Sequence, residues 1–353
     1  MSSIYGKNIK ISIFGQSHSE AIGVTVDGLP AGFTVDTEKL SSFMAKRSAS
    51  GKAYATRRSE PDKPEFICGL LENTTCGAPL TAIIHNTNTK SKDYENLAVT
   101  PRPSHADYTA ELKYAGFQDK SGGGHFSGRL TAPLCIAGSI CKQILEEQGI
   151  FIYAHIKSIK DIEDDSFNPL CPIEAKDGNF PVLNESKKEK MLEVIENART
   201  NADSVGGIIE CGITGVPVGL GEPMFEGVEN RISQIVFGVP AVKGIEFGNG
   251  FDCTCIKGSE NNDSFILDND EVLTKTNNHG GILGGISSGM PIIFRVAIKP
   301  TPSIGLPQQS VNLSEMEETT LTINGRHDPC IVPRAVPCIE AAAAIAMLDM
   351  LLD

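Results

Sequence analysis

The sequence predicts an α+β protein that forms a single layered domain, and three observations lead to this expectation. Strand-like runs outnumber helical segments, so helices do not alternate with single strands as they do in a doubly wound parallel sheet. No repeat, low-complexity tract or Pro/Ser-rich linker divides the 353 residues. Hydrophobic residues make up 40% of the chain and charged residues 21%, which is a composition that can bury a large core.

Each expected element has its own local signal. Alternating or β-branched residues predict six strands. They lie at residues 9–14, 23–27, 80–85, 152–159, 207–213 and 291–298. Apolar residues at three- and four-residue spacing predict a helix over 130–148, before Gly149. Ser186 with Glu189 three positions later has the capping-box pattern and predicts a second helix. Pro337 is expected to start a third, Ala-rich helix at the C-terminus. The polar stretch 160–190 is interpreted as a surface excursion from the single domain 1–353.

The charge balance limits the classes of partner. The chain has 31 Lys+Arg and 44 Asp+Glu, a formal net charge of −13. A general nucleic-acid or anionic-membrane binder would show a basic excess, so we expect neither partner. No apolar run approaches the ~18 residues of a membrane span. The most apolar segment, 341–352, is interrupted by Asp349.

The N-terminus and the cysteines indicate the cytoplasm. Residues 1–10 have neither an apolar signal core nor an Arg-rich transit pattern. Most of the ten cysteines lie in apolar stretches, and no C-x-x-C occurs. We therefore expect buried reduced thiols and no metal site, with the Cys253 and Cys255 pair on a strand-like segment.

Glycines are abundant and lie beside ionisable groups. There are 35, about a tenth of the chain, against ~7% in average proteins. Five of the seven histidines occupy Gly-rich or polar joints: His18, His105, His125, His279 and His327. Glycine lets the backbone approach a ligand and present N–H groups to anions, so these joints predict an anionic small-molecule site. The other two, His85 and His155, lie in apolar strand-like runs and are expected to be core histidines.

Common catalytic motifs do not explain these joints. The chain has no P-loop, no G-x-G-x-x-G and no H-E-x-x-H. No G-x-S-x-G elbow supports a hydrolase, because the match G-I-S-S-G at 285–289 lies within a glycine-rich run. The glycine-rich run 280–289 fits two interpretations equally, a place where backbones cross and a wall against a flat ligand.

Short segments along nearly the whole chain match those of one protein family in the same order. On these segments the chain resembles chorismate synthase. The matching segments are G-Q-S-H-S-E at 15–20, R-P-S-H-A-D-Y-T at 102–109, S-G-G-G-H-F-S-G-R at 121–129, G-L-G-E-P at 219–223, A-V-K-G-I-E-F-G-N-G-F at 241–251, N-H-G-G-I-L-G-G-I-S-S-G at 278–289, K-P-T-P-S-I at 299–304 and G-R-H-D-P-C at 325–330.

The resemblance implies the last step of the shikimate pathway. In that step 5-enolpyruvylshikimate 3-phosphate loses phosphate and a ring hydrogen by anti-1,4-elimination and becomes chorismate. It also implies reduced FMN without net redox change, a β-α-β layered fold and a homotetramer. We expect a separate flavin reductase, with NADPH as an indirect reductant, because no nicotinamide fingerprint is visible.

The resemblance assigns roles to particular residues. His18 is the acid at the leaving phosphate, His105 the proton donor to the flavin, and Asp328 assists hydrogen uptake. The substrate's phosphate and two carboxylates call for fork-shaped donors, which Arg47, Arg102, Arg129 and Arg326 would supply. A solvated helix face is the alternative for Arg47, and Arg57 and Arg58 are weaker candidates. The expected flavin contacts are His125, Phe126, Ser127, Pro240, Ala241, Gly284, Lys299, Pro300, Thr301, Pro302, Ser303 and Arg326.

Several positions depart from the family pattern. His125 stands where the family has an arginine, and Leu130 where it has an acid. An arginine expected after Arg47 falls on Ala53, beside Lys52, and the Asn-Ala pair near the flavin reads Pro240 and Ala241. These changes affect the expected contacts to the flavin phosphate and to a nicotinamide, and they leave the three catalytic candidates in place.

Two other functions remain as alternatives. A flavin oxidoreductase acting on an anionic substrate would consume reductant in proportion to product. A non-catalytic binder of phosphorylated metabolites would need the arginines and glycines, but it would not need His18, His105 and Asp328 beside them.

Overall fold

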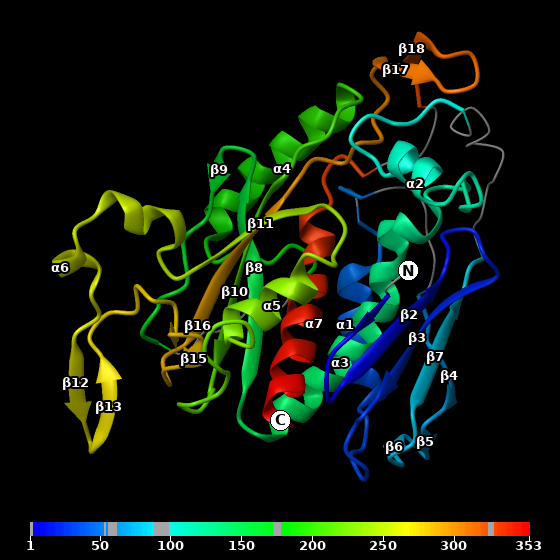
Figure 1. Ribbon diagram of the computed structural model, residues 1–353. Coiled ribbons are helices and arrows are strands. Elements are labelled where there is room, and N and C mark those ends of the chain that lie inside the picture. The colour runs from blue at the N-terminus through cyan, green and yellow to red at the C-terminus, as the bar shows by residue number, and fades with distance from the viewer. Residues whose placement is uncertain (1–2, 53, 56–61, 88–98, 172–177, 324–327) are drawn as a thin grey trace.

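The protein has three layers, with helices between two antiparallel sheets (Figure 1). The computed structural model describes residues 3–52, 54–55, 62–87, 99–171, 178–323 and 328–353. Buried side chains from both sheets and from the helices between them form one main hydrophobic core. The predicted α+β class and the β-α-β layering are confirmed.

Each outer layer is a five-stranded sheet in which all pairings are antiparallel. The first sheet has the order β1 (Ile4–Tyr5), β2 (Lys10–Gly15), β3 (Ala21–Asp27), β7 (Leu80–His85) and β4 (Glu65–Cys68). The second has the order β11 (Val242–Phe247), β16 (Ile292–Ile298), β10 (Gly207–Thr214), β8 (Phe151–Ile159) and β9 (Ile162–Glu163). All six predicted strands are present, within two residues of the expected ends.

Four helices pack among or beside the sheets in the central region of Figure 1. They are α1 (Thr37–Arg47), α3 (Thr131–Glu147), α5 (Val228–Val236) and α7 (Val332–Leu351). Helix α7 packs against α3, α1 and α5 and also against β8 and β10. From Val332 to Met350 every α7 residue except Arg334 is buried, as expected for a helix that is apolar all round.

The helix ends differ from the sequence predictions in two places. Helix α7 begins at Val332, so the expectation that Pro337 starts it is wrong; Pro337 lies inside the helix. Proline costs one backbone hydrogen bond there, and packing on all sides of α7 outweighs that loss. Helix α4 (Glu185–Thr200) is capped by Asn184, whose side chain accepts from the Ser186 N–H, so Ser186 is not the cap.

The remaining elements are short. They are the helices α2 (Asp107–Lys113) and α6 (Gly258–Asn261), the 3-10 turns η2 (Gly124–Phe126), η3 (Gly128–Leu130) and η4 (Gly250–Cys255), and the hairpins β5–β6 (Leu70–Leu71, Thr74–Thr75), β12–β13 (Phe265–Asp268, Glu271–Thr274), β14–β15 (Ile282–Leu283, Ile286–Ser287) and β17–β18 (Gln308–Asn312, Glu317–Leu321). In the described part of the chain, no helix is long and apolar enough to cross a membrane.

A buried carboxylate ties the two ends of the chain together. Asp349, near the end of α7, is fully buried and accepts backbone N–H bonds from Lys7, Asn8 and Ile9. It also pairs with Arg231 of α5. The charge that interrupts the apolar C-terminal segment is therefore neutralised by a cation and by the start of the first sheet.

The cysteine prediction is half right. All ten cysteines are free thiols, but five of them are exposed: Cys68, Cys76, Cys171, Cys253 and Cys255. Cys253 and Cys255 lie on η4, so the predicted strand is wrong there.

The two strand histidines have different environments. His85 is exposed at the end of β7 and pairs with Glu65, so its prediction as a core residue is wrong. His155 on β8 is buried, as predicted, between two carboxylates. Its Nε2 lies 2.9 Å from Glu210 Oε2, and its Nδ1 lies 3.3 Å from Asp164 Oδ2. Those carboxylates also accept N–H bonds from Phe167 and Leu183, which hold the chain after β9 against the sheet.

The His155 cluster makes stability depend on pH. Burial alone would lower the pKa of His155, but Asp164 and Glu210 outweigh burial and raise it. A raised folded-state pKa contributes stability that is complete below the ordinary histidine pKa of ~6.5 and is lost as pH rises through the folded value.

We therefore expect His155→Gln to lower the free energy of unfolding most near pH 6, by about 3 kcal/mol, because two buried carboxylates lose their cation. The difference from wild type should shrink in alkaline solution. Denaturant titrations across pH measure it. His85→Gln is the control, since an exposed pair contributes at most about 1 kcal/mol. A loss that is equal at all pH values would contradict the assignment.

Candidate active site

A cavity of about 580 Å³ lies at the N-terminal ends of α3 and α7. Its wall includes Thr131, the first residue of α3, and Ile331 and Arg334 at the start of α7. The first N–H groups of a helix have no partner within it, and the helix dipole is positive at that end. Two long helices thus direct partial positive charge at one volume.

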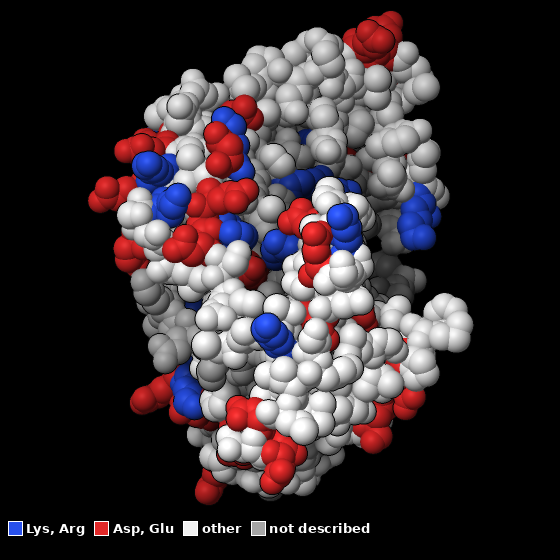
Figure 2. Space-filling view, turned by 90° about the vertical axis from the view of Figure 1, so that its left-hand side faces the viewer, with Lys and Arg blue, Asp and Glu red and all other residues white. Residues whose placement is uncertain are grey.

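The cavity lining is cationic although the whole chain is acidic. Among the described residues, its wall contains five Lys or Arg side chains and two carboxylates. The cations are Arg47, Arg102, Arg129, Lys299 and Arg334, and the acids are Asp62 and Asp328. In Figure 2, Lys and Arg atoms lie within the hollow near the middle of the face, and Asp and Glu atoms are spread around it. The arrangement suits a ligand with several negative charges.

Two buried arginines share one aspartate. Arg47 donates from Nη1 to Asp62 at 2.7 Å, from Nε to Thr131 at 2.9 Å and from Nη2 to the Gly128 carbonyl at 3.0 Å. Arg129 pairs with the other Asp62 oxygen. Burial would raise the pKa of Asp62, but the two arginines outweigh burial and lower it. Arg47 is 4% exposed, so the solvated-face alternative is wrong.

A second ion pair fixes His105. Asp107 accepts from Arg102 Nε and Nη2, both at 2.7 Å, and its Oδ1 lies 2.6 Å from His105 Nδ1. Arg102 Nη2 is also near Nδ1, at 3.1 Å. A nitrogen that donates to Asp107 cannot accept from Arg102, so we assign the proton on Nδ1 to the shorter contact. Burial would raise the pKa of Asp107, but its bonds from Arg102 and His105 lower it. The carboxylate therefore stays ionised and orients His105.

A loop of three glycines separates the two candidate histidines. Gly122, Gly123 and Gly124 have φ of +66°, +133° and +51°, a region that other residues rarely adopt. A Cβ at Gly122 would lie 2.3 Å from His18 Cε1, and one at Gly123 would lie 3.4 Å from His105 Nε2. Gly122 and His105 line the cavity, and His18 lies directly behind Gly122. The glycines thus bring both rings next to the cavity wall.

His125 uses both of its ring nitrogens within the protein. Nδ1 is 2.8 Å from the Gly15 carbonyl, to which it donates, and Nε2 is 2.6 Å from Ser3 Oγ, from which it accepts. His125 joins the glycine loop to the turn between β2 and β3. His125, Phe126 and Ser127 all line the cavity, and Phe126 is 40% exposed.

The far wall comes from the ends of β11 and β16. Pro240, Ala241, Lys299, Thr301, Pro302 and Ser303 line it. Lys299 Nζ donates to the Ser104 carbonyl, and burial, with a smaller effect of Lys243, lowers the pKa of Lys299. The Thr301 Oγ1 is buried and has no hydrogen-bond partner among the described residues. A buried hydroxyl without a partner is costly, so it marks a position where a ligand can bond.

Two expected flavin contacts do not line the cavity. Pro300 is absent from its wall, and Gly284 lies on the β14–β15 turn. In the glycine-rich run 280–289, Cβ atoms at Gly280, Gly281 and Gly285 would overlap backbone of neighbouring segments. At those three positions, backbone crossing explains the glycines.

The structure adds residues that the sequence did not single out. Arg334 lines the cavity, pairs with the candidate Asp328, and donates from Nε to the Arg47 carbonyl at 3.0 Å. Lys52 is buried and caps the end of α1 by donating to the carbonyls of Ala45 and Lys46. Burial, together with Arg334 and Arg47, lowers its pKa to about 8. An arginine isolated in the apolar segment 331–352 was the available signal for Arg334.

Some candidates lie outside the described residues. They are Ala53, Arg57, Arg58, Arg326 and His327. His279 does not line the cavity. Its Nδ1 lies 3.1 Å from Asp263 Oδ2.

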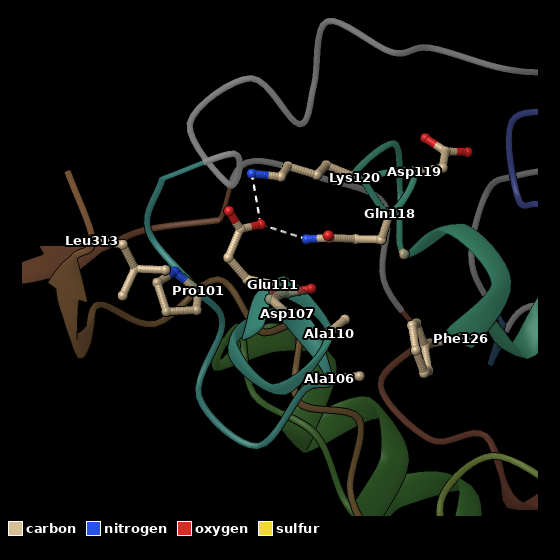
Figure 3. Close-up of a pocket in the computed structure, with 11 residues that line it drawn as sticks. Pro101, Ala106, Asp107, Ala110, Glu111, Gln118, Asp119, Lys120, Phe126 and Leu313 are labelled. Atoms are coloured by element: carbon tan, nitrogen blue, oxygen red, sulfur yellow. Dashed lines mark hydrogen bonds and ion pairs between the residues drawn. The ribbon is translucent and has the colours of Figure 1, made fainter. Parts of the chain in front are cut away.

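A second pocket shares Ala106 and Phe126 with the cavity (Figure 3). It holds only about 30 Å³, the space of one or two water molecules. In Figure 3, Glu111 extends across it and bonds to Lys120 and Gln118. Because its charged wall is mostly acidic, it does not extend the anion site.

Comparisons with known proteins identify the fold and the family. The profile of the family described as chorismate synthase matches residues 9–352. The chain is 48% identical to the chorismate synthase of Lancefieldella parvula over 99% of this chain and 96% of that protein. It is 46% identical to the one of Thermococcus kodakarensis over 98% and 97%. A crystal structure of a chorismate synthase matches with a TM-score of 0.77 and 25% identity, covering 99% of this chain and 93% of the other.

Proposed function

The chain belongs to the chorismate synthase family and catalyses the last step of the shikimate pathway, and we propose that the cavity at the ends of α3 and α7 is its active site. The observation that carries the proposal is the cationic wall around a histidine held by a partly buried aspartate. The substrate carries one phosphate and two carboxylates. Five cationic side chains and two helix N-termini supply complementary charge in one place.

The wall also fits reduced FMN, which membership of the family implies. The volume lies within the range of about 300–1,000 Å³ that small-molecule sites occupy. The unpartnered Thr301 Oγ1, the Lys299 ammonium and the exposed Phe126 ring are suitable donors and packing surface. We assign cofactor contacts to Phe126, Ser127, Pro240, Ala241, Lys299, Thr301, Pro302 and Ser303. When bound, reduced FMN supplies electron density as phosphate leaves and regains it as the ring hydrogen departs.

Each catalytic candidate then has a proton to hold or transfer. His18, behind Gly122, donates to the leaving phosphate. Asp107 orients the His105 ring through Nδ1, which leaves Nε2 as the atom through which we assign proton transfer to the flavin. Asp328, which pairs with Arg334, assists the uptake of the ring hydrogen by the flavin. Arg47, Arg102, Arg129 and Arg326 bind the anionic groups of the substrate. Positioned acids and bases typically contribute about 10²–10⁴-fold each.

The supply of reduced flavin is assigned to another protein. We propose a separate flavin reductase that uses NADPH, since the chain has no G-x-G-x-x-G motif for a nicotinamide dinucleotide. We place the enzyme in the cytoplasm, whose reducing conditions suit ten free thiols.

We also propose self-association, to a homotetramer, through the β12–β13 hairpin. Phe265 and Leu267 are 68% and 79% exposed, and within the described chain the two strands form a separate sheet. An isolated hairpin is marginally stable in water, so this apolar ribbon calls for a covering surface. Phe225 and Phe251 expose further apolar surface on the loops before α5 and on η4. Figure 2 shows long uncharged stretches on this side of the molecule.

An anaerobic assay tests the proposed chemistry. With 5-enolpyruvylshikimate 3-phosphate and reduced FMN, we expect chorismate and phosphate in equal amounts and flavin still reduced at the end. His105→Ala should bind both ligands but turn over at least about a hundredfold more slowly, because it lacks the imidazole that Asp107 orients for proton transfer. His85→Ala, at an exposed pair, is the control.

Flavin oxidised in proportion to product would instead indicate an oxidoreductase. Binding of the substrate without any turnover would indicate a metabolite-binding protein. Full activity of His105→Ala would contradict the role given to that residue.

Gly122→Ala tests the placement of His18. We expect a loss of turnover of at least about tenfold, because the new Cβ displaces the His18 ring. Gly149→Ala is the matched control: its φ is also positive, at +77°, but nothing lies within 4 Å of the added Cβ. Both variants carry ~1 kcal/mol of backbone strain, which thermal unfolding measures. Equal turnover in the two variants would contradict the placement.

Leu267→Glu tests the hairpin interface. A buried unpaired carboxylate is unfavourable, so sedimentation velocity should show a smaller assembly than wild type. Leu112→Glu on α2 is the control, since Leu112 is exposed to a similar degree and lies on a different element. An unchanged sedimentation coefficient for Leu267→Glu would place the interface elsewhere.

A further inference from the structure

Two buried thiols meet where α3 and α7 cross. The helices approach so closely that a Cβ at Gly138 would lie 2.3 Å from the Ala341 Cα. One turn earlier on each helix, Cys135 Sγ and Cys338 Sγ are 3.8 Å apart. The contact follows from the helix crossing, and neither thiol takes part in the chemistry assigned above.

The two thiols differ in access and in charge environment. Cys338 lines the cavity, whereas Cys135 is fully buried behind it. Cys135 donates to Cys338 Sγ, and Arg47, Thr131 and Arg334 surround the acceptor. The hydrogen bond from Cys135 and then these neighbours lower the pKa of Cys338. Burial raises the pKa of Cys135, and it does the same for Cys141 and Cys211.

We propose that Cys338 is a modification site for peroxides at the floor of the cavity, and that Cys135 resolves the product into a Cys135–Cys338 disulfide. Thiolates, not thiols, attack peroxides, and nearby cations favour the thiolate. Cys338 is only 2% exposed, so a reagent as small as hydrogen peroxide is the class that reaches it through the cavity. The proposal rests on the thiols and their surroundings and is independent of the proposed catalytic roles.

The chemistry balances with hydrogen peroxide as the oxidant. The Cys338 thiolate attacks one peroxide oxygen, the O–O bond breaks, and a sulfenic acid and hydroxide form. The Cys135 sulfur then attacks the Cys338 sulfur, an S–S bond forms, and the oxygen leaves as water. Two thiols lose two electrons, and one peroxide becomes two waters.

The bond would change the active-site floor. The sulfurs must approach from 3.8 Å to about 2.05 Å, which links α3 and α7 near the ends that form the cavity. It also removes the S–H group through which Cys338 donates to the Arg334 carbonyl. We therefore expect oxidised protein to turn over more slowly and a dithiol reductant to restore it.

The test is mass-spectrometric mapping of the full chain. Protein is treated with hydrogen peroxide at neutral pH, free thiols are alkylated, and the digest is searched for the Cys135–Cys338 cross-linked peptide. We expect that peptide in wild type and in Cys141→Ser, its disappearance after treatment with dithiothreitol, and none in Cys338→Ser. Because peptides are mapped, oxidation of the five exposed thiols does not interfere.

A second measurement uses the wild-type protein alone. Hydrogen peroxide should consume the Cys338 thiol at least about tenfold faster than that of Cys141 or Cys211 at neutral pH, because Cys338 lines the cavity and lies beside Arg47 and Arg334. The remaining thiols are alkylated after quenching and unfolding and are counted by mass spectrometry. Absence of the cross-linked peptide after the exposed thiols have been oxidised would overturn the proposal. Loss of the Cys338 thiol no faster than that of Cys141 would overturn it as well.

Discussion

The close parallel contact of α3 and α7 is the constraint on which the site depends. Only glycine fits at position 138, where the helix lies against Ala341, and the alanines that follow keep α7 narrow. The contacts of residue 135 with 338 and of 138 with 341 advance together, so the helices run in the same direction and their N-termini end side by side. Arg47 at the end of α1 bonds to Thr131 of α3 and receives a bond from Arg334 of α7. Three helix ends are thereby locked around one cavity.

This arrangement buries positively charged side chains, and Asp62 lowers the free-energy cost of burying them. Arg47 and Arg129 are 4% and 7% exposed, and burying two guanidinium groups without a counterion would cost several kcal/mol each. Asp62 neutralises one of the two positive charges and fixes the orientation of both forks. The cavity still has more cations than carboxylates, so its net attraction for an anion persists. The acidic total of the chain describes the outer surface and says nothing about this local balance.

The sequence predicted the elements better than their surroundings. The strands were predicted correctly because alternating or β-branched residues mark them in the sequence, as in β7 and β16. The burial of His85 was predicted wrongly because an apolar run does not show where a strand leaves the core. Pro337 was wrongly expected to start α7 because proline propensity is a local signal, whereas α7 is stabilised by packing. Asp62, Arg334 and the Cys135–Cys338 pair were missed for a different reason. Their partners are far apart in sequence, and only the helix crossing brings them together.

The glycine excess has a specific geometric purpose in this site. Gly122 and Gly123 leave room for two histidine rings on either side of one loop, and any side chain at Gly122 would occupy the volume of His18. His125, which follows Gly124, turns to Gly15 and Ser3, so it ties this loop to the segment that carries His18. It also lines the cavity, but both of its ring nitrogens are used within the protein. In this chain the position thus stabilises the geometry of the loop, and the cationic contacts to ligands come from Lys299 and the arginines.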